Sequence, residues 1–112
     1  MPTPLYLWIS YDLGIRGDYD GLYAWLDEYD ARECGDSLAL IRVTVDGDVF
    51  SWLREELEEV VDLTKRSRLY AIVFSADERR LKARFVFGNR KSPPWSGFGP
   101  EGEQEDEIDE DA

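Results

Sequence analysis

The sequence predicts one α+β domain whose elements follow the order strand, helix, strand, strand, helix, strand, with a further strand at the end. Three observations predict it. An apolar run at Leu5–Asp12 opens the chain and ends on a carboxylate. Two later segments carry apolar residues at helical spacing, and others carry the runs and alternations typical of strands. With 112 residues, of which 43% are hydrophobic, the chain can bury one sizeable core.

The first helix is expected over residues 19–30, after a loop that two glycines bracket. Asp18 is placed to cap its N-terminus, because a carboxylate there accepts hydrogen bonds from the first free backbone N–H groups. One face of this helix is apolar at the spacing i, i+3, i+4 and i+7, through Leu22, Trp25, Leu26 and Tyr29.

A hairpin is expected next, with a short strand at residues 31–34, a turn at 35–36 and a clear strand at 38–45. Asp48 follows a turn at residues 46–47 and is expected to cap the second helix. The apolar stripe of that helix consists of Phe50, Leu53, Leu57, Val60 and Val61.

The last two strands are expected at residues 67–75 and 81–87, joined by a turn at 76–79. The first of them has apolar residues on both faces, which predicts a central position covered on both sides. The second alternates, with Leu81, Ala83, Phe85 and Phe87 on one face and Lys82, Arg84 and Val86 on the other.

Residues 89–99 are rich in glycine and proline, and the pair Pro93-Pro94 excludes a regular element there. Trp95 and Phe98 on this segment are expected either to dock a partner protein or to fold back onto the body. Residues 100–112 carry eight acids and no base and are expected to form a disordered acidic tail. The predicted organisation is therefore a folded domain at 1–88, this segment at 89–99 and the tail at 100–112.

The net charge of −12 is unevenly distributed along the chain. Residues 1–63 contain 15 acids and 4 bases, whereas residues 64–99 contain 9 bases and 2 acids. An overall field of this sign repels phosphate, so non-specific binding of nucleic acid is disfavoured. The basic block is the exception, and it is either a local footprint for phosphate or a solvated face balanced by acidic neighbours.

Side chains needed for several kinds of catalysis are missing. The chain contains no histidine, which excludes serine–histidine and cysteine–histidine nucleophile schemes. Its lone cysteine, Cys34, excludes an internal disulfide framework. No apolar run reaches the roughly 18 residues of a membrane span, and no signal peptide is evident, so we expect a cytoplasmic protein without membrane contact.

The predicted order of elements is that of a ferredoxin-like βαββαβ sandwich with an additional C-terminal strand. Four of its segments resemble the Cas-two family of small CRISPR adaptation proteins and their VapD-type relatives. These segments are the opening strand, which ends in Tyr11-Asp12, the strand at 37–41, the helix at 50–57 and the strand at 68–72. The resemblance covers residues 5–88.

The resemblance implies a homodimer that associates with DNA or RNA in CRISPR adaptation or in a related defence or mobile-element system. It also implies that Asp12 is a metal ligand and catalytic residue that faces its counterpart across the dimer axis. Mg²⁺ held there would support endonuclease activity, with dimerisation supplying the second carboxylate. The alternative from the residues themselves is that Asp12 caps the turn after the first strand.

Basic residues expected to contact phosphate are Arg16, Arg79, Arg80, Lys82 and Arg84, with Lys65, Arg66, Arg68, Arg90 and Lys91 as further candidates. Lys82 and Arg84 share one face of one strand and are the first choice among them. Two other functions stand beside the nucleic-acid hypothesis. One is a non-catalytic protein-interaction module that acts through a dimeric sheet and the C-terminal segment, and the other is an acidic mimic of nucleic acid.

Overall fold

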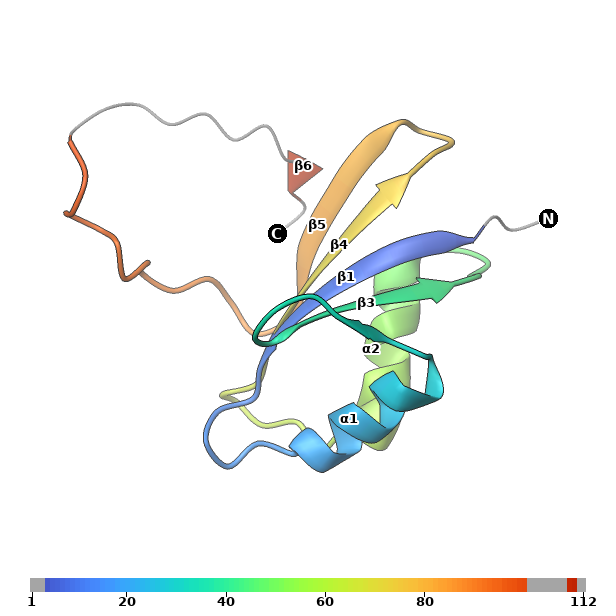
Figure 1. Cartoon of the computed structure of the whole chain (residues 1–112), viewed down its shortest axis with the longest axis horizontal. Coiled ribbons are helices and arrows are strands. Elements are labelled where there is room, and N and C mark those ends of the chain that lie inside the picture. The colour runs from blue at the N-terminus through green and yellow to red at the C-terminus, as the bar shows by residue number, and fades with distance from the viewer. Residues whose placement is uncertain (1–3, 101–108, 111–112) are drawn as a thin grey trace.

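The structure is a computed structural model and describes residues 4–100 and 109–110. It has two layers, an antiparallel sheet and a pair of helices that lie on one face of it (Figure 1). The helices are α1 (Tyr19–Glu28) and α2 (Val49–Val60). The strands are β1 (Leu5–Asp12), β2 (Arg32–Glu33), β3 (Leu38–Val43), β4 (Arg68–Ser75), β5 (Arg80–Phe87) and β6 (Asp109–Glu110).

β1 lies in the middle of the sheet. Among the described residues the strand order is β2-β3-β1-β4-β5-β6, in which the pairs from β2 to β5 are antiparallel and β6 runs parallel to β5. The predicted α+β class is confirmed, and the arrangement is compatible with a ferredoxin-like sandwich. None of the helices in the described part of the chain combines the length and hydrophobicity that a bilayer crossing requires.

Successive side chains along each strand point to opposite faces of the sheet, and one face is covered by the helices while the other is not. Leu7 and Ile9 of β1 are fully buried beneath the helices, whereas Tyr6 is 52% exposed on the opposite side, which we call the open face. β4 likewise sends its odd-numbered residues into the core. The expectation that β4 is covered on both sides is wrong, since Phe74 on the open face is 47% exposed.

Both helices begin at the carboxylates that the sequence indicated. Asp18 accepts from the Asp62 N–H at 2.9 Å and from the Gly21 N–H at 3.0 Å, so one side chain ties the start of α1 to the segment after α2. These two hydrogen bonds lower the pKa of Asp18. Asp48 accepts from the N–H and the hydroxyl of Ser51 at 3.0 and 2.7 Å and caps α2.

Two predicted apolar patterns differ from the structure. Val60, the last residue of α2, is 47% exposed, whereas the C-cap residue Val61, four positions after Leu57, is buried. In β5 the alternation stops at Val86, where the register against β4 shifts. Val86 is buried and Phe87 also packs against the core, as expected when a bulge interrupts the regular alternation of a strand.

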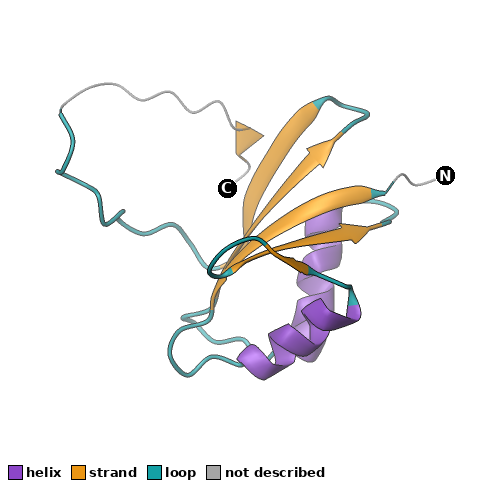
Figure 2. Cartoon of the chain, viewed as in Figure 1, coloured by secondary structure: helices purple, strands orange, loops and turns teal. Residues whose placement is uncertain are grey.

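The end of the chain leaves the sheet and returns to it. Residues 89–99 contain turns but no helix or strand, and they run outward from the body (Figure 2). β6 then places Asp109 opposite Lys82 and Glu110 opposite Ala83, along the edge of β5. The predicted disordered tail spans residues 100–112 and so includes β6, where the structure has a strand, whereas residues 101–108 and 111–112 lie outside the described residues.

Candidate functional site

Three strands of the open face bring side chains together in two rows at the end of β1. Ser10 pairs with Tyr70, and Tyr70 pairs with Phe85, which makes one row across β1, β4 and β5. Asp12 pairs with Arg68 in the next row. Because directly opposed residues project from the same face of a sheet, all five side chains share the open face.

These five side chains line a hollow of about 320 Å³, together with Arg90. Two further hollows adjoin it. One, of about 450 Å³, adds Gly14, Lys65, Arg66, Gly88, Asn89 and Lys91. The other, of about 370 Å³, adds Lys91 and residues 92–95. Five bases therefore border one region, and we call them the basic cluster: Lys65, Arg66, Arg68, Arg90 and Lys91.

Guanidinium groups lie against aromatic rings in the first hollow. The guanidinium carbon of Arg68 is 5.5 Å from the Phe85 ring centroid, and that of Arg90 is 5.6 Å from Phe85 and 6.0 Å from Tyr70. The Tyr70 and Phe85 rings meet edge to face, with centroids 4.7 Å apart. The Arg68 Nε donates to the Asn89 carbonyl oxygen at 3.1 Å. These contacts hold two cations against a ring surface.

Asp12 lines the first two of these hollows and is the one acid among the described residues that line any of the three. Its Oδ1 accepts from the Gly14 N–H at 3.0 Å, which is the turn-capping role predicted as the alternative to a metal ligand. Within the described residues, no three Asp, Glu, Cys or His side chains are grouped as a metal site requires. A divalent cation would also be repelled by Arg68 and its basic neighbours. The described residues around Asp12 in one chain therefore do not fit a Mg²⁺ site, and a site completed by a second copy of Asp12 stays a prediction.

Three of the predicted phosphate contacts lie far from this region. Arg80 pairs with Ser75 at the opposite end of β4, roughly 23 Å from the start of that strand at about 3.3 Å per residue, and Arg79 precedes it in the turn. Lys82 forms an ion pair with Glu78, with Nζ and Oε2 2.7 Å apart. These bases belong to the far hairpin and not to the basic cluster.

Arg84 and Arg16 occupy different places. Arg84 lies on the helix-covered face, where its guanidinium carbon is 5.0 Å from the Phe50 ring centroid. Arg16 lines a hollow with Lys65 and Arg66, beside the basic cluster. Of the five basic residues expected to contact phosphate, Arg16 is thus the one that the fold brings next to the basic cluster.

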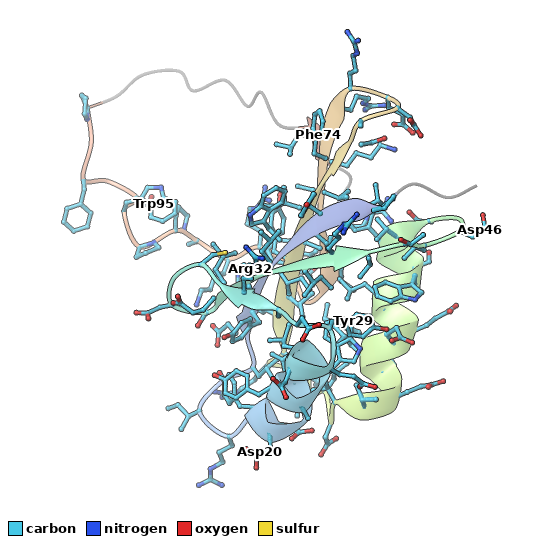
Figure 3. All side chains as sticks on the ribbon, turned by 45° about the vertical axis from the view of Figure 1, so that its right-hand side comes forward. Asp20, Tyr29, Arg32, Asp46, Phe74 and Trp95 are labelled. Carbon is cyan, nitrogen blue, oxygen red and sulfur yellow. The ribbon has the colours of Figure 1, made fainter. Side chains whose placement is uncertain are left out.

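The two aromatic residues of segment 89–99 are both exposed. Trp95 is 70% exposed and Phe98 is 85% exposed, so neither folds back into the core. Trp95 nevertheless lines the third hollow with Arg68 and Arg90, and Figure 3 shows it on the segment that leaves the sheet. Trp95 therefore belongs to the rim of the site, whereas Phe98 remains available for a partner.

Exposed acids gather on the helix layer instead. Asp20 and Asp27 of α1 are exposed, as are Glu55, Glu58 and Glu59 of α2. Figure 3 shows Asp20 on the helix side of the molecule. The described part of the molecule is therefore electrically polarised, with acids over the helices and bases at one end of the open face.

Sequence patterns alone missed Tyr70 and Phe85 as site residues. Each looked like an ordinary strand residue, and their nearness to Asp12 depends on the register of three strands. A signal was nevertheless present. Bases directly precede the strand at 68–75 and directly follow the strand at 80–87, and the two groups must meet if these strands form a hairpin.

Comparison of the chain with protein-family models, with curated proteins and with solved structures finds no match. The functional argument therefore depends on the geometry of the site.

Proposed function

We propose that this protein binds single-stranded nucleic acid at the end of the open face where the basic cluster surrounds Tyr70 and Phe85. The observation that carries the proposal is the packing of Arg68 and Arg90 against these rings inside one hollow. Proteins that bind single strands combine a basic groove for the backbone with aromatic side chains on which bases stack. Both features occur here in one region.

The bases and the rings take different parts in this binding. Lys65, Arg66 and Lys91 border the outer hollows and are placed to contact phosphates, which fix position without reading sequence. Arg68 and Arg90 lie against the rings and offer, with them, a surface for one base. An unpaired base can enter such a hollow, whereas a base inside a duplex is stacked and paired. This difference favours a single strand as the ligand.

The acidity of the chain limits the strength of binding. A net charge of −12 repels phosphate at a distance, but screening confines that field to about 8–10 Å at ordinary ionic strength. Near the surface the basic cluster dominates. Each phosphate contact in a single strand contributes about 0.7 to the slope of log affinity against log salt. We therefore expect binding that weakens with salt, with a slope that corresponds to a few phosphates.

We further propose a ferredoxin-like sandwich that acts as a cytoplasmic, nucleic-acid-associated adaptor of the Cas-two type, in CRISPR adaptation or a related defence system. The position of β1 between β3 and β4 supports the fold. Tyr6, Phe74 and Leu81 are exposed at the end of the open face away from the basic cluster, which supports a homodimer contact there. Cleavage through Asp12 is not part of this proposal, because the described residues that line its hollows offer a single carboxylate among bases.

One observation favours protein binding as a second function. Phe98 is 85% exposed on a segment that carries Pro93 and Pro94. An exposed aromatic residue in a proline-containing segment outside the sheet is suited to a groove on a partner protein. Phe98→Ser should therefore leave oligonucleotide affinity unchanged, and a loss of affinity would assign Phe98 to the nucleic-acid site instead.

The primary proposal is tested by fluorescence anisotropy with short labelled RNA and DNA oligonucleotides of mixed sequence. The double variant Arg68→Ala/Arg90→Ala should lose about tenfold or more in affinity, because each contact to a phosphate or base is worth about 1 kcal/mol or more. The matched control is Arg79→Ala/Arg80→Ala, which removes the same charge at the far hairpin and should retain most of the affinity.

The outcomes separate a site from a general charge effect. Equal losses in the two double variants would show that net charge, and not this site, controls binding. No measurable binding of the wild-type protein at low salt would overturn the proposal itself. Thermal unfolding of each variant by circular dichroism shows whether the fold is intact.

A further inference from the structure

We infer that Asp12 and Arg68 together select guanine as the base that enters the first hollow. This inference rests on the proposed binding of single strands and adds to it a base specificity and a role for Asp12. The two residues are direct partners in the register of β1 against β4, so a carboxylate and a guanidinium stand side by side on the open face. Both line the hollow that contains the Tyr70 and Phe85 rings.

The hydrogen-bonding capacity of this pair is defined by its chemistry. An ionised carboxylate only accepts, with about four lone-pair sites, so the hydrogen bond from Gly14 leaves Asp12 able to accept more. A guanidinium only donates, through five N–H groups, and Arg68 uses its Nε–H on Asn89. Asp12 and Arg68 therefore present hydrogen-bond acceptors and hydrogen-bond donors side by side to an incoming base.

Guanine matches this edge better than the other bases do. Its Watson–Crick edge carries the O6 acceptor next to two donors, N1–H and the N2 amino group. The donors fit Asp12 and O6 fits Arg68, because a guanidinium donates to guanine O6, as it does together with N7 on the other edge of guanine in DNA complexes. Adenine, cytosine and uracil each place an acceptor beside their donor on that edge, and this acceptor would face the Asp12 carboxylate without a hydrogen bond.

The surroundings of the pair suit a neutral base. The hollow measures about 320 Å³, which lies at the lower end of the range of small-molecule sites and is sufficient for one base. The Tyr70 and Phe85 rings supply apolar surface, and Ser10 adds a hydroxyl on the β1 side. A base can use the negative and the positive group at once, whereas a metal ion is attracted by one and repelled by the other. The basic neighbours that disfavour Mg²⁺ at Asp12 are thus compatible with guanine.

The inference is tested with labelled oligoadenylates that carry guanine, inosine or adenine at one central position. Inosine keeps O6 and N1–H but lacks the N2 amino group, so it removes one donor. We expect the wild-type protein to bind the guanine oligonucleotide roughly tenfold more tightly than the adenine one, with inosine between them. Asp12→Asn keeps an acceptor for Gly14 but removes the carboxylate, and it should abolish the preference for guanine.

The control variant Asp77→Asn removes the same charge in the turn at the far hairpin and should keep the preference. Equal binding of the three oligonucleotides by the wild-type protein would overturn the inference while leaving the proposed function intact. A guanine preference that survives in Asp12→Asn would also overturn it. A failure to bind any of the oligonucleotides would instead reject the proposed function.

Discussion

The guanidinium of Arg68 lies 5.5 Å from the centre of the Phe85 ring, and the two residues come from the neighbouring strands β4 and β5. The Nε of the same side chain donates to Asn89, whose carbonyl oxygen is 3.1 Å away. A planar guanidinium that is held on one side by a ring keeps its terminal N–H groups available for a phosphate or a base. In this way a chain of net charge −12 still presents an ordered cation on an aromatic surface.

Replacing Phe85 with leucine should weaken oligonucleotide binding about fivefold or more, because a base stacked on an aromatic ring is worth about 1–3 kcal/mol. Leucine retains apolar contact with Tyr70 but offers no ring for stacking. The measurement is fluorescence anisotropy at fixed salt. Phe74→Leu, on the same face at the other end of β4, is the control and should bind like the wild type. Equal effects in the two variants would contradict a role for the Phe85 ring.

Replacing Gly21 with alanine should destabilise the protein, although alanine is the better helix former. An added Cβ would lie 2.7 Å from the carbonyl oxygen of Val60 and would also clash with the Asp18 carboxylate. Because α1 must shift to relieve these contacts, we expect a loss of about 1–3 kcal/mol in the free energy of unfolding, measured by urea denaturation. The control, Asp27→Ala at an exposed position of the same helix, should change the free energy of unfolding by less than about 0.5 kcal/mol. A stabilised Gly21→Ala variant would show that the two helices are not in close contact there.

Asp18 should make the stability of the fold depend on pH in the acid range. Hydrogen bonds from the N–H groups of Asp62 and Gly21 lower its pKa from the ordinary value of 3.8. A carboxylate with a lowered pKa stabilises the folded state above the unfolded pKa, and this contribution disappears as the pH falls through the folded value. The difference in unfolding free energy between wild type and Asp18→Asn should therefore be greatest above about pH 4 and decrease below it.

The control for this titration is Asp20→Asn, which removes an exposed acid two residues further along the chain. Urea denaturation of the three proteins across the acid range is the measurement. If the difference in unfolding free energy between the wild type and Asp18→Asn does not change with pH, Asp18 is not the titrating group.

Tyr29 should titrate at unusually high pH because of its surroundings. Burial, the hydrogen bond to Glu56 and the negative charge of Glu56 raise the pKa of Tyr29 to about 12. The Tyr29 hydroxyl donates to the Glu56 Oε1 at 2.7 Å, and the Trp25 Nε1 donates to the same oxygen at 3.2 Å. The contribution of protonated Tyr29 to the stability of the folded state should be complete below about pH 10. It should be lost as the pH rises towards 12.

This prediction is checked by the absorbance change of tyrosine ionisation, taken as the difference between each protein and its Tyr29→Phe counterpart. Glu56→Gln removes the charge but keeps an amide oxygen, so the pKa of Tyr29 should fall while remaining above its ordinary value. A pKa of Tyr29 that is the same with glutamate and with glutamine would exclude Glu56 as a cause of the shift.

Local features of this fold follow from the sequence because their causes lie a few residues apart. Asp18 and Asp48 are helix caps that their own neighbourhoods specify. The burial of Leu22 and Trp25 follows from helical periodicity in the same way. The bulge at Val86 is different, because it depends on how β5 fits against β4, and alternation within one strand contains no sign of it.

The site is a long-range feature, and this explains which of its residues the sequence indicated. Lys82 and Arg84 were preferred because they share one face of one strand, yet Lys82 pairs with Glu78 of the far hairpin and Arg84 lies against Phe50 of α2. Asp12 and Arg68 are 56 positions apart in the chain and become neighbours only through the antiparallel pairing of β1 with β4. Basic residues that flank two paired strands are therefore a better guide to such a site than bases that alternate within one strand.

The central claim, that single-stranded nucleic acid binds at the basic cluster, is tested most directly by nuclear magnetic resonance of the isotope-labelled protein. Backbone amide shifts are recorded while a short unlabelled oligonucleotide is added. We predict that the shift changes concentrate at residues 10–14, 65–70 and 85–95. Changes confined to the hairpin turn at 76–80, or spread without pattern over the surface, would contradict the assignment of the site to the end of β1.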